Sequence, residues 1–274
     1  MQLYINGKWV GEAEATVPFR DRGFQLGESL FETIRVNGGH PFRVQKHMER
    51  MQSGMDTIQL DAPTSLEQIP GLVDEYIERN KIVDSLVRIM ITRGTSAPGA
   101  EPAIYISSRE LPPVDSWPVK VVFLEEKNYP ILRFHPAIKS GNYLGNMLAK
   151  RDAEQVGAFE PVFINPEGYI TECAIRNVFF IKNGTLYTPS LELGVLPGVI
   201  RDTIMELARK RGLQVEESFI RAERVDAMDE AFISSTGVGV LPIFWDGFQS
   251  NYDISQELRN DLTDVFEAGE RNVT

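Results

Sequence analysis

Lys139 stands in an unusual place for a strongly hydrated cation, because it follows the apolar pair Ala137-Ile138 and precedes Ser-Gly-Asn, where a chain turns or a helix begins. One interpretation is a lysine at a strand end that reaches solvent. The other is an amine that serves as a nucleophile or base. Lys150 lies in a charged run and is interpreted as a solvated helix residue.

A carboxylate in an apolar stretch is the second candidate. Glu172 lies in "EGYITECAIRNVFFI", two residues after Ile170 and close to Val178 and Phe179. A buried carboxylate is costly unless it meets a cationic or protonated partner. The partner is either a structural ion pair or a nitrogen of a ligand, and the sequence leaves both open.

Two stretches offer groups that could hold an anion. The helix expected from about Gly198 to Arg211 opens on Pro197-Gly198 without a Ser, Thr or Asp cap, so its first amides are available to water or to an anion. Three hydroxyl residues, Ser234 to Thr236, end an apolar strand before Gly237 and suit a phosphate. Neither a dinucleotide fingerprint nor a P-loop is present, since Pro242 stands at the third position of the glycine pattern.

Composition and charge exclude several classes of protein. The 274 residues carry a formal net charge of −11, which disfavours a nucleic-acid surface. A single cysteine and three scattered histidines give no disulfide framework and no metal site. No signal peptide or membrane-length apolar run is visible, so we expect a cytoplasmic protein without membrane or nucleic-acid partners.

Periodicity predicts the elements that position these residues. In the N-terminal part, two hairpins open the chain, the first with a turn at Gly7-Lys8. A helix follows from about Val44 to Ile58, then another over residues 64–80, interrupted at Pro70, and then two paired strands. In the C-terminal part, strands alternate irregularly with a helix beginning after Lys139, the helix near 198–211 and a closing helix.

This pattern predicts a mixed α/β protein of two domains without regular βαβ alternation. The proline-rich stretch 111–118 is the best linker candidate. We therefore place a small N-terminal α/β domain at 1–113, a linker at 114–118 and a larger, strand-rich C-terminal domain with helices at 119–274.

In combination, the motifs resemble those of the class IV aminotransferases, the fold-type IV enzymes that use pyridoxal phosphate (PLP). The matching segments follow one another in order across almost the whole chain: "DRGFQLGESLFETIR", "IKSGNYLGNMLAKRDA", "EGYITECAIRNVFFIKNG" with "GVLPGVIRDTI", and "DEAFISSTGVGVLPI". The family includes branched-chain and D-amino-acid aminotransferases, (R)-selective amine transaminases and aminodeoxychorismate lyase.

The resemblance implies roles around the cofactor ring. Lys139 would form the covalent bond to the cofactor and then act as general base and acid. Glu172 would face the pyridine nitrogen and keep it protonated. Tyr143 matches a tyrosine near the phenolic oxygen, and Leu196 a hydrophobic residue near the ring.

The resemblance also implies a phosphate site made of Arg50, the amides of Val199 and Ile200, and Thr236. Many relatives have threonine where Ile200 stands, so only a backbone contact is expected there.

For the substrate, the resemblance places Phe31, Thr33 and Arg88 near the pocket, with the amides of the Gly237-Val238 turn for a carboxylate. Arg88 matches the branched-chain group, although Leu86 replaces that group's tyrosine. The D-amino-acid enzymes have Arg and His where this chain has Pro98 and Ala100, and the lyases' Arg-Gly-Tyr is missing.

The resulting hypothesis is a PLP-dependent aminotransferase and homodimer that moves an amino group between a branched-chain-like or D-amino acid and a 2-oxo acid such as 2-oxoglutarate, with ping-pong kinetics. Aminodeoxychorismate lyase, an (R)-selective amine transaminase and a non-catalytic relative are the alternatives.

Overall fold

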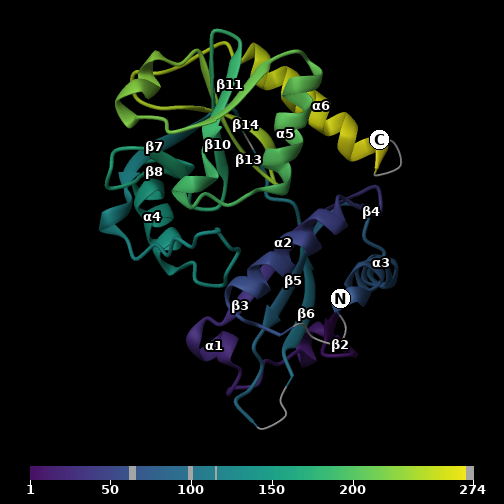
Figure 1. The fold of residues 1–274 in the computed structure, drawn as a ribbon. Coiled ribbons are helices and arrows are strands. Elements are labelled where there is room, and N and C mark those ends of the chain that lie inside the picture. The colour runs from purple at the N-terminus through teal and green to yellow at the C-terminus, as the bar shows by residue number, and fades with distance from the viewer. Residues whose placement is uncertain (62–65, 98–100, 115, 270–274) are drawn as a thin grey trace. The chain divides into compact units, whose positions relative to one another are not determined.

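The computed structural model describes residues 1–61, 66–97, 101–114 and 116–269. The chain divides into two compact units (Figure 1). Unit 1 comprises Met1–Leu111, Ile138–Asn142 and Phe266–Thr274, and unit 2 comprises Pro112–Ala137 and Tyr143–Val265. Lys139 thus lies in a short segment that unit 1 takes from the second half of the sequence. The domain boundaries given above stay a prediction.

Unit 1 is built on a six-stranded sheet in the order β2-β1-β6-β5-β3-β4, in which every neighbouring pair is antiparallel. The first hairpin is confirmed, but its turn is Asn6-Gly7 and not Gly7-Lys8. Both turn residues have positive φ, as a type I′ turn requires. The strands are β1 Gln2–Ile5, β2 Lys8–Gly11, β3 Ser29–Asn37, β4 His40–Pro41, β5 Ser85–Thr92 and β6 Ala103–Arg109.

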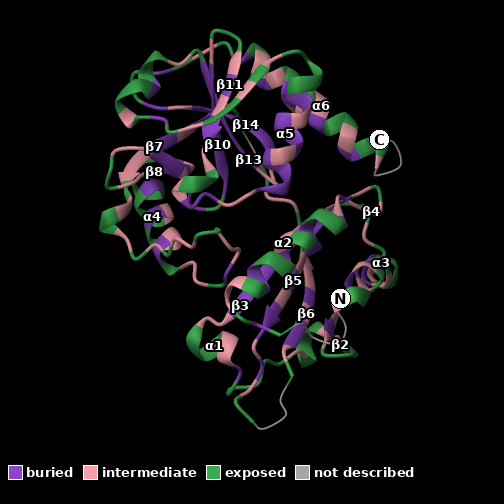
Figure 2. Ribbon diagram, in the orientation of Figure 1, coloured by how far each residue is buried: buried purple, intermediate pink, exposed green. Residues whose placement is uncertain are grey.

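Two helices, α2 (Val44–Thr57) and α3 (Ile69–Asn80), pack on one face of this sheet, and a short helix α1 (Arg22–Leu26) precedes β3. Figure 2 shows their inner sides buried and their outer sides exposed. The predicted interruption at Pro70 is wrong. Pro70 stands in the first turn of α3, where its missing N–H costs nothing.

Strand β3 presents two different sets of side chains. Leu30, Ile34 and Val36 belong to the core under α2 and α3. Because side chains alternate along a strand, Glu32 points to the same helix-covered face, while Phe31 and Thr33 point to the other one. This alternation decides which chemistry each face can support.

The segment Ile138–Asn142 is fixed to the start of β3. Phe31 N donates to Lys139 O at 3.0 Å, and Gly141 N donates to Ser29 O at 2.9 Å. A Cβ on Gly141 would lie 2.2 Å from the hydroxyl oxygen of Ser29, so a larger residue here would force the Ser29 side chain to move. The backbone of Lys139 is therefore held by a regular strand.

Unit 2 contains an eight-stranded sheet in the order β12-β11-β10-β13-β14-β7-β8-β9. The pairs β7–β8, β14–β7 and β11–β12 are parallel, and the others are antiparallel. The strands are β7 Val119–Glu125, β8 Glu160–Ile164, β9 Ile170–Cys173, β10 Asn177–Lys182, β11 Thr185–Pro189, β12 Gln214–Ser218, β13 Glu230–Ser235 and β14 Gly239–Phe244.

The remaining α-helices of the described chain are α4 (Leu144–Gln155), α5 (Val199–Lys210) and α6 (Asp253–Ala268). Buried Ala149 of α4 packs with Phe163 and Ala174, and α5 packs against β12 and β13. The mixed α/β class without regular βαβ alternation is confirmed. Among the described helices, none is long and apolar enough to cross a membrane.

Candidate functional site

The side chain of Lys139 lies against an aromatic ring of unit 1. Its Nζ is 4.5 Å from the centre of the Phe31 ring, and the guanidinium carbon of Arg88 is 4.0 Å from the same centre. Thr33 is the register partner of Arg88 across β3 and β5, so these side chains share the face not covered by α2. The structure thus brings together four residues for which the family resemblance implied a role at one site: Phe31, Thr33, Arg88 and Lys139.

Arg50 of α2 meets a carboxylate that the sequence analysis did not identify. Glu32 Oε1 accepts from Arg50 Nε at 2.8 Å, and Glu32 Oε2 accepts from Arg50 Nη2 at 2.5 Å. The same Oε2 lies 2.7 Å from His47 Nδ1. The side chains of Glu32 and His47 are fully buried, and that of Arg50 is 11% exposed.

Burial and the hydrogen-bonded partners act in opposite directions on the pKa values of Glu32 and His47. Burial opposes ionisation of Glu32, but Arg50 and His47 outweigh it and lower the pKa of Glu32 to about 2. Burial lowers the pKa of His47 against the opposing effect of Glu32, and the positive charges of Arg50 and Lys139 add to the lowering. Since an ionised carboxylate only accepts, neutral His47 carries its proton on Nδ1. Its Nε2 has no hydrogen-bond partner among the described residues.

Glu172 of β9 has a cationic partner inside unit 2. Arg133 Nη1 donates to Glu172 Oε1, and the amide of Leu196 donates to Glu172 Oε2 at 3.2 Å. The two charged side chains are 16% and 14% exposed. The structural ion pair left open by the sequence is therefore present, and a role toward a ligand nitrogen stays a prediction.

Arg133 is itself held by a second carboxylate. Its Nε donates to Glu126 Oε1 at 3.1 Å and its Nη2 to Thr171 Oγ1 at 3.0 Å. Burial opposes the charge of Arg133, but Glu172 and Glu126 outweigh it and raise the pKa of the guanidinium. Arg133 therefore remains a cation and pairs with the Glu172 carboxylate. Sequence reasoning missed both Arg133 and Glu126, although Arg133 between Leu132 and Phe134 was a usable signal.

The first turn of α5 is built as the sequence predicted, without a side-chain cap on Gly198. Asn177 Nδ2 donates to Leu196 O at 3.0 Å, and a Cβ on Gly198 would lie 2.1 Å from Asn177 Oδ1. Glycine is needed here for a close approach. Val199 and Ile200 are 6% and 2% exposed, and because their side chains carry no donor they can offer an anion only their amides.

The end of β13 lies beside this turn, because Asn177 is also the register partner of Ser234. The buried hydroxyl of Ser234 has no hydrogen-bond partner within the described chain. Thr236 follows in the turn to β14, where Val238 N donates to Ser235 Oγ at 3.4 Å. Amides, hydroxyls and the Glu172 carboxylate are thereby gathered in unit 2.

The remaining predicted residues are placed as follows. Tyr143 is half-buried immediately before α4, and Gly237 stands between β13 and β14. Pro98 and Ala100 lie outside the described residues. Lys150 is not a solvated residue, since its Nζ donates to Phe159 O at 2.9 Å and its side chain is only 22% exposed.

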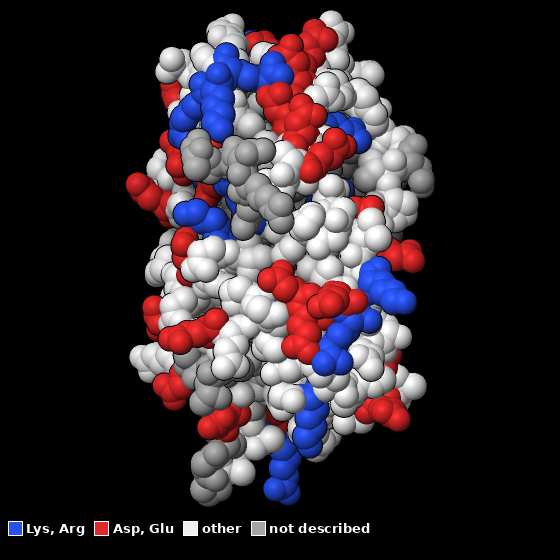
Figure 3. All heavy atoms as spheres, turned by 90° about the vertical axis from the view of Figure 1, so that its right-hand side faces the viewer, with Lys and Arg blue, Asp and Glu red and all other residues white. Residues whose placement is uncertain are grey.

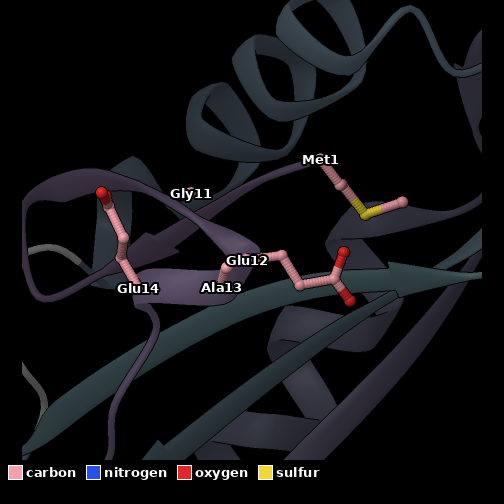
Figure 4. Close-up of a pocket in the computed structure, with 5 residues that line it drawn as sticks. All are labelled: Met1, Gly11, Glu12, Ala13 and Glu14. Carbon is pink, nitrogen blue, oxygen red and sulfur yellow. The ribbon is translucent and has the colours of Figure 1, made fainter.

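Other features of the surface do not point to a second functional site. A pocket of unit 1, lined by Met1 and residues 11–14, has two carboxylates that point in different directions (Figure 4). On the face in Figure 3, basic side chains lie among acidic ones, in keeping with the acidic net charge. In the described chain, no cluster of three His, Cys, Asp or Glu residues could hold a metal ion.

Comparisons with known proteins identify the family. The family model for amino-transferase class IV matches residues 29–244. The chain is 32% identical to a D-alanine aminotransferase of Listeria monocytogenes, over 89% of this chain and 86% of the relative. It is 32% identical to an aminodeoxychorismate lyase of Bacillus subtilis, over 88% of this chain and 85% of the relative.

A solved structure supports the same conclusion. The branched-chain aminotransferase of Thermoproteus uzoniensis, determined with norvaline, superposes with a TM-score of 0.90 at 26% identity, covering 99% of this chain and 96% of that one. The matched region contains the pairing of Lys139 with β3, the Glu32–Arg50 pair and the start of α5. The chain therefore belongs to the class IV aminotransferase family.

Proposed function

We propose that this protein is a PLP-dependent aminotransferase that moves an amino group between an amino acid and a 2-oxo acid by a ping-pong mechanism. Class IV aminotransferases use PLP. The observation that carries the proposal is the setting of Lys139, whose backbone is fixed to β3 and whose Nζ lies 4.5 Å from the Phe31 ring centre. Fixed geometry of this kind is what a reactive amine requires.

The polar groups described above have the chemistry that each part of PLP requires. Arg50, the amides of Val199 and Ile200, and the Thr236 hydroxyl would hold the phosphate. The nearby hydroxyl of Ser234, which has no hydrogen-bond partner among the described residues, is a further polar group in this region. Lys139 would hold the aldehyde carbon, Glu172 would face the ring nitrogen, and two side chains would lie near the ring: Tyr143 and Leu196.

When bound, the cofactor supplies an electron sink for negative charge that develops at the substrate's α-carbon. Lys139 Nζ would take the proton from that carbon and later deliver it to the cofactor carbon that receives the amino group. Arg133 would hold the Glu172 carboxylate in place for the ring nitrogen.

For the substrate, Phe31 and Thr33 would line the pocket, while Arg88 and the amides of Gly237 and Val238 would bind a carboxylate. We propose a branched-chain-like or D-amino acid as donor and 2-oxoglutarate as an acceptor, with an (R)-selective amine transaminase as an alternative. The similarity to the Bacillus subtilis lyase supports aminodeoxychorismate lyase as the second candidate.

A half-reaction screen tests the function. Purified protein loaded with PLP is mixed with both enantiomers of common amino acids and with simple chiral amines, and the absorbance is followed. We expect at least one donor to convert the cofactor to its pyridoxamine form. Conversion by none of them, together with production of 4-aminobenzoate from aminodeoxychorismate, would reject the aminotransferase and favour the lyase. A protein that binds no chromophore would indicate the non-catalytic relative.

We also propose a homodimer in the cytoplasm. Four apolar side chains near α1 are more than half exposed: Val17, Phe19, Phe24 and Leu26. Clustered exposed apolar side chains are typical of an interface. Replacing Phe24 by serine should shift sedimentation toward the monomer, whereas replacing the exposed Val83, which is not one of these four side chains, should not. A wild-type protein that sediments as a monomer would contradict the dimer.

A further inference from the structure

The fully buried Glu32 has no place in the proposed chemistry, yet three donors converge on it. Arg50 Nε, Arg50 Nη2 and His47 Nδ1 all lie within 2.8 Å of its two oxygens. Burying an ionised carboxylate costs several kcal/mol after relaxation, so its partners must offset about that much. An apolar residue at position 32 would fit the surrounding core of Leu30 and Ile34 without this cost.

We propose that Glu32 is a positioning residue that fixes the guanidinium of Arg50 for the phosphate group of the cofactor. The inference rests on the proposed function, because it assigns Arg50 to that phosphate. A guanidinium is planar, and two hydrogen bonds along its Nε–Nη2 edge fix that plane. The directions of its remaining N–H groups are then fixed before an anion arrives, which lowers the entropic cost of binding.

His47 completes the arrangement from the same helix. It lies three residues before Arg50 on α2, which places both side chains on one side of the helix. Its Nδ1–H occupies one lone pair of Glu32 Oε2 and so restricts how the carboxylate can rotate. Burial lowers the pKa of His47, which favours a neutral ring that orients Glu32 without adding a second positive charge beside Arg50.

The charge of Glu32 and its positioning of Arg50 have opposite effects on anion binding, so replacing Glu32 distinguishes the two. The negative charge of Glu32 also weakens the attraction of Arg50 for an anion. If charge dominated, Glu32→Gln would tighten phosphate binding. If positioning dominates, the same change weakens it, since the amide has one acceptor oxygen and its NH2 group must face a donor of Arg50 or His47.

The experiment compares the dissociation constants of PLP and of pyridoxal, which lacks the phosphate, for the wild-type protein and Glu32→Gln, by absorbance of the bound chromophore. We expect PLP binding to weaken roughly 10- to 100-fold, the range of a charged hydrogen bond, while pyridoxal binding changes little. A purely structural role would weaken both ligands equally.

Controls keep the outcomes separate. Glu160, fully buried and paired with Arg176 in unit 2, is the matched control, and Glu160→Gln should leave the PLP-to-pyridoxal ratio unchanged. If Glu32→Gln does not fold, Glu32→Asp takes its place. This variant keeps the charge but moves the carboxylate, so its preference for PLP over pyridoxal should fall, but less than is expected for Glu32→Gln. An unchanged or increased preference for PLP over pyridoxal in Glu32→Gln would overturn the positioning role of Glu32 and leave the proposed function untouched. Failure of the wild-type protein to bind PLP would overturn the proposed function with it.

Discussion

Replacing Lys139 by alanine is expected to lower the transamination rate by roughly two to four orders of magnitude, the usual scale for loss of a positioned general base. The covalent bond to the cofactor would also be lost, so the visible spectrum of the loaded protein should become that of PLP held without a covalent bond. Single-turnover kinetics with a donor found by the screen, together with the absorbance spectrum, measure both effects.

Two controls separate the amine from its charge. Lys139→Arg keeps a cation against the Phe31 ring but offers no amine that can form the covalent bond, so it should lose as much activity as alanine. Lys46→Ala, an exposed lysine of α2, should retain the wild-type spectrum. A wild-type spectrum in Lys139→Ala would show that another residue binds the cofactor and would reject the assignment.

The environment of Lys139 illustrates what a sequence can and cannot give. The apolar pair before it and the turn residues after it marked the position, and strand and helix periodicity placed the neighbouring elements. Its attachment to β3 required the pairing of residues more than a hundred positions apart. Local pattern carries no information about such a contact, because register depends on the tertiary fold.

Glu32 and Lys150 show two different reasons for missed contacts. Glu32 occupies a core-facing position between Leu30 and Ile34, so strand alternation alone could have indicated a buried carboxylate in need of partners. Lys150 follows an ordinary charged pattern, yet its Nζ reaches the carbonyl of Phe159. A charged run predicts an exposed helix face on average, and a single long side chain can still bury its stem.

The pairing of Arg133 with Glu172 could not be predicted from the local sequence for a different reason. The cost of burying Glu172 predicted that a partner must exist, but physical chemistry does not say which of the chain's Lys and Arg residues supplies it. The family resemblance suggested a ligand nitrogen, and the structure adds Arg133. The two need not compete, since a carboxylate with two oxygens can accept from more than one donor.

Glu172→Gln is expected to lower kcat by roughly 100- to 1,000-fold, the scale on which removal of one preorganised electrostatic group acts. The reason is that a neutral amide would no longer favour a protonated ring nitrogen. The same change is also expected to destabilise the fold by about 1 to 3 kcal/mol, because the amide cannot accept from both Arg133 and Leu196. Steady-state kinetics and thermal unfolding measure the two effects.

Glu126→Gln distinguishes the proposed role of Glu172 from a purely structural one. Glu126 binds the other side of the same guanidinium, so its replacement removes one negative charge from Arg133 at a comparable cost in stability. Only Glu172 is proposed to face the cofactor, so Glu126→Gln should lower kcat less than about tenfold, as expected for an indirect effect of below 1.4 kcal/mol. Equal losses in the two variants would mean that Glu172 serves only to hold Arg133. A large loss confined to Glu172→Gln would instead require that its carboxylate acts directly on the ring nitrogen.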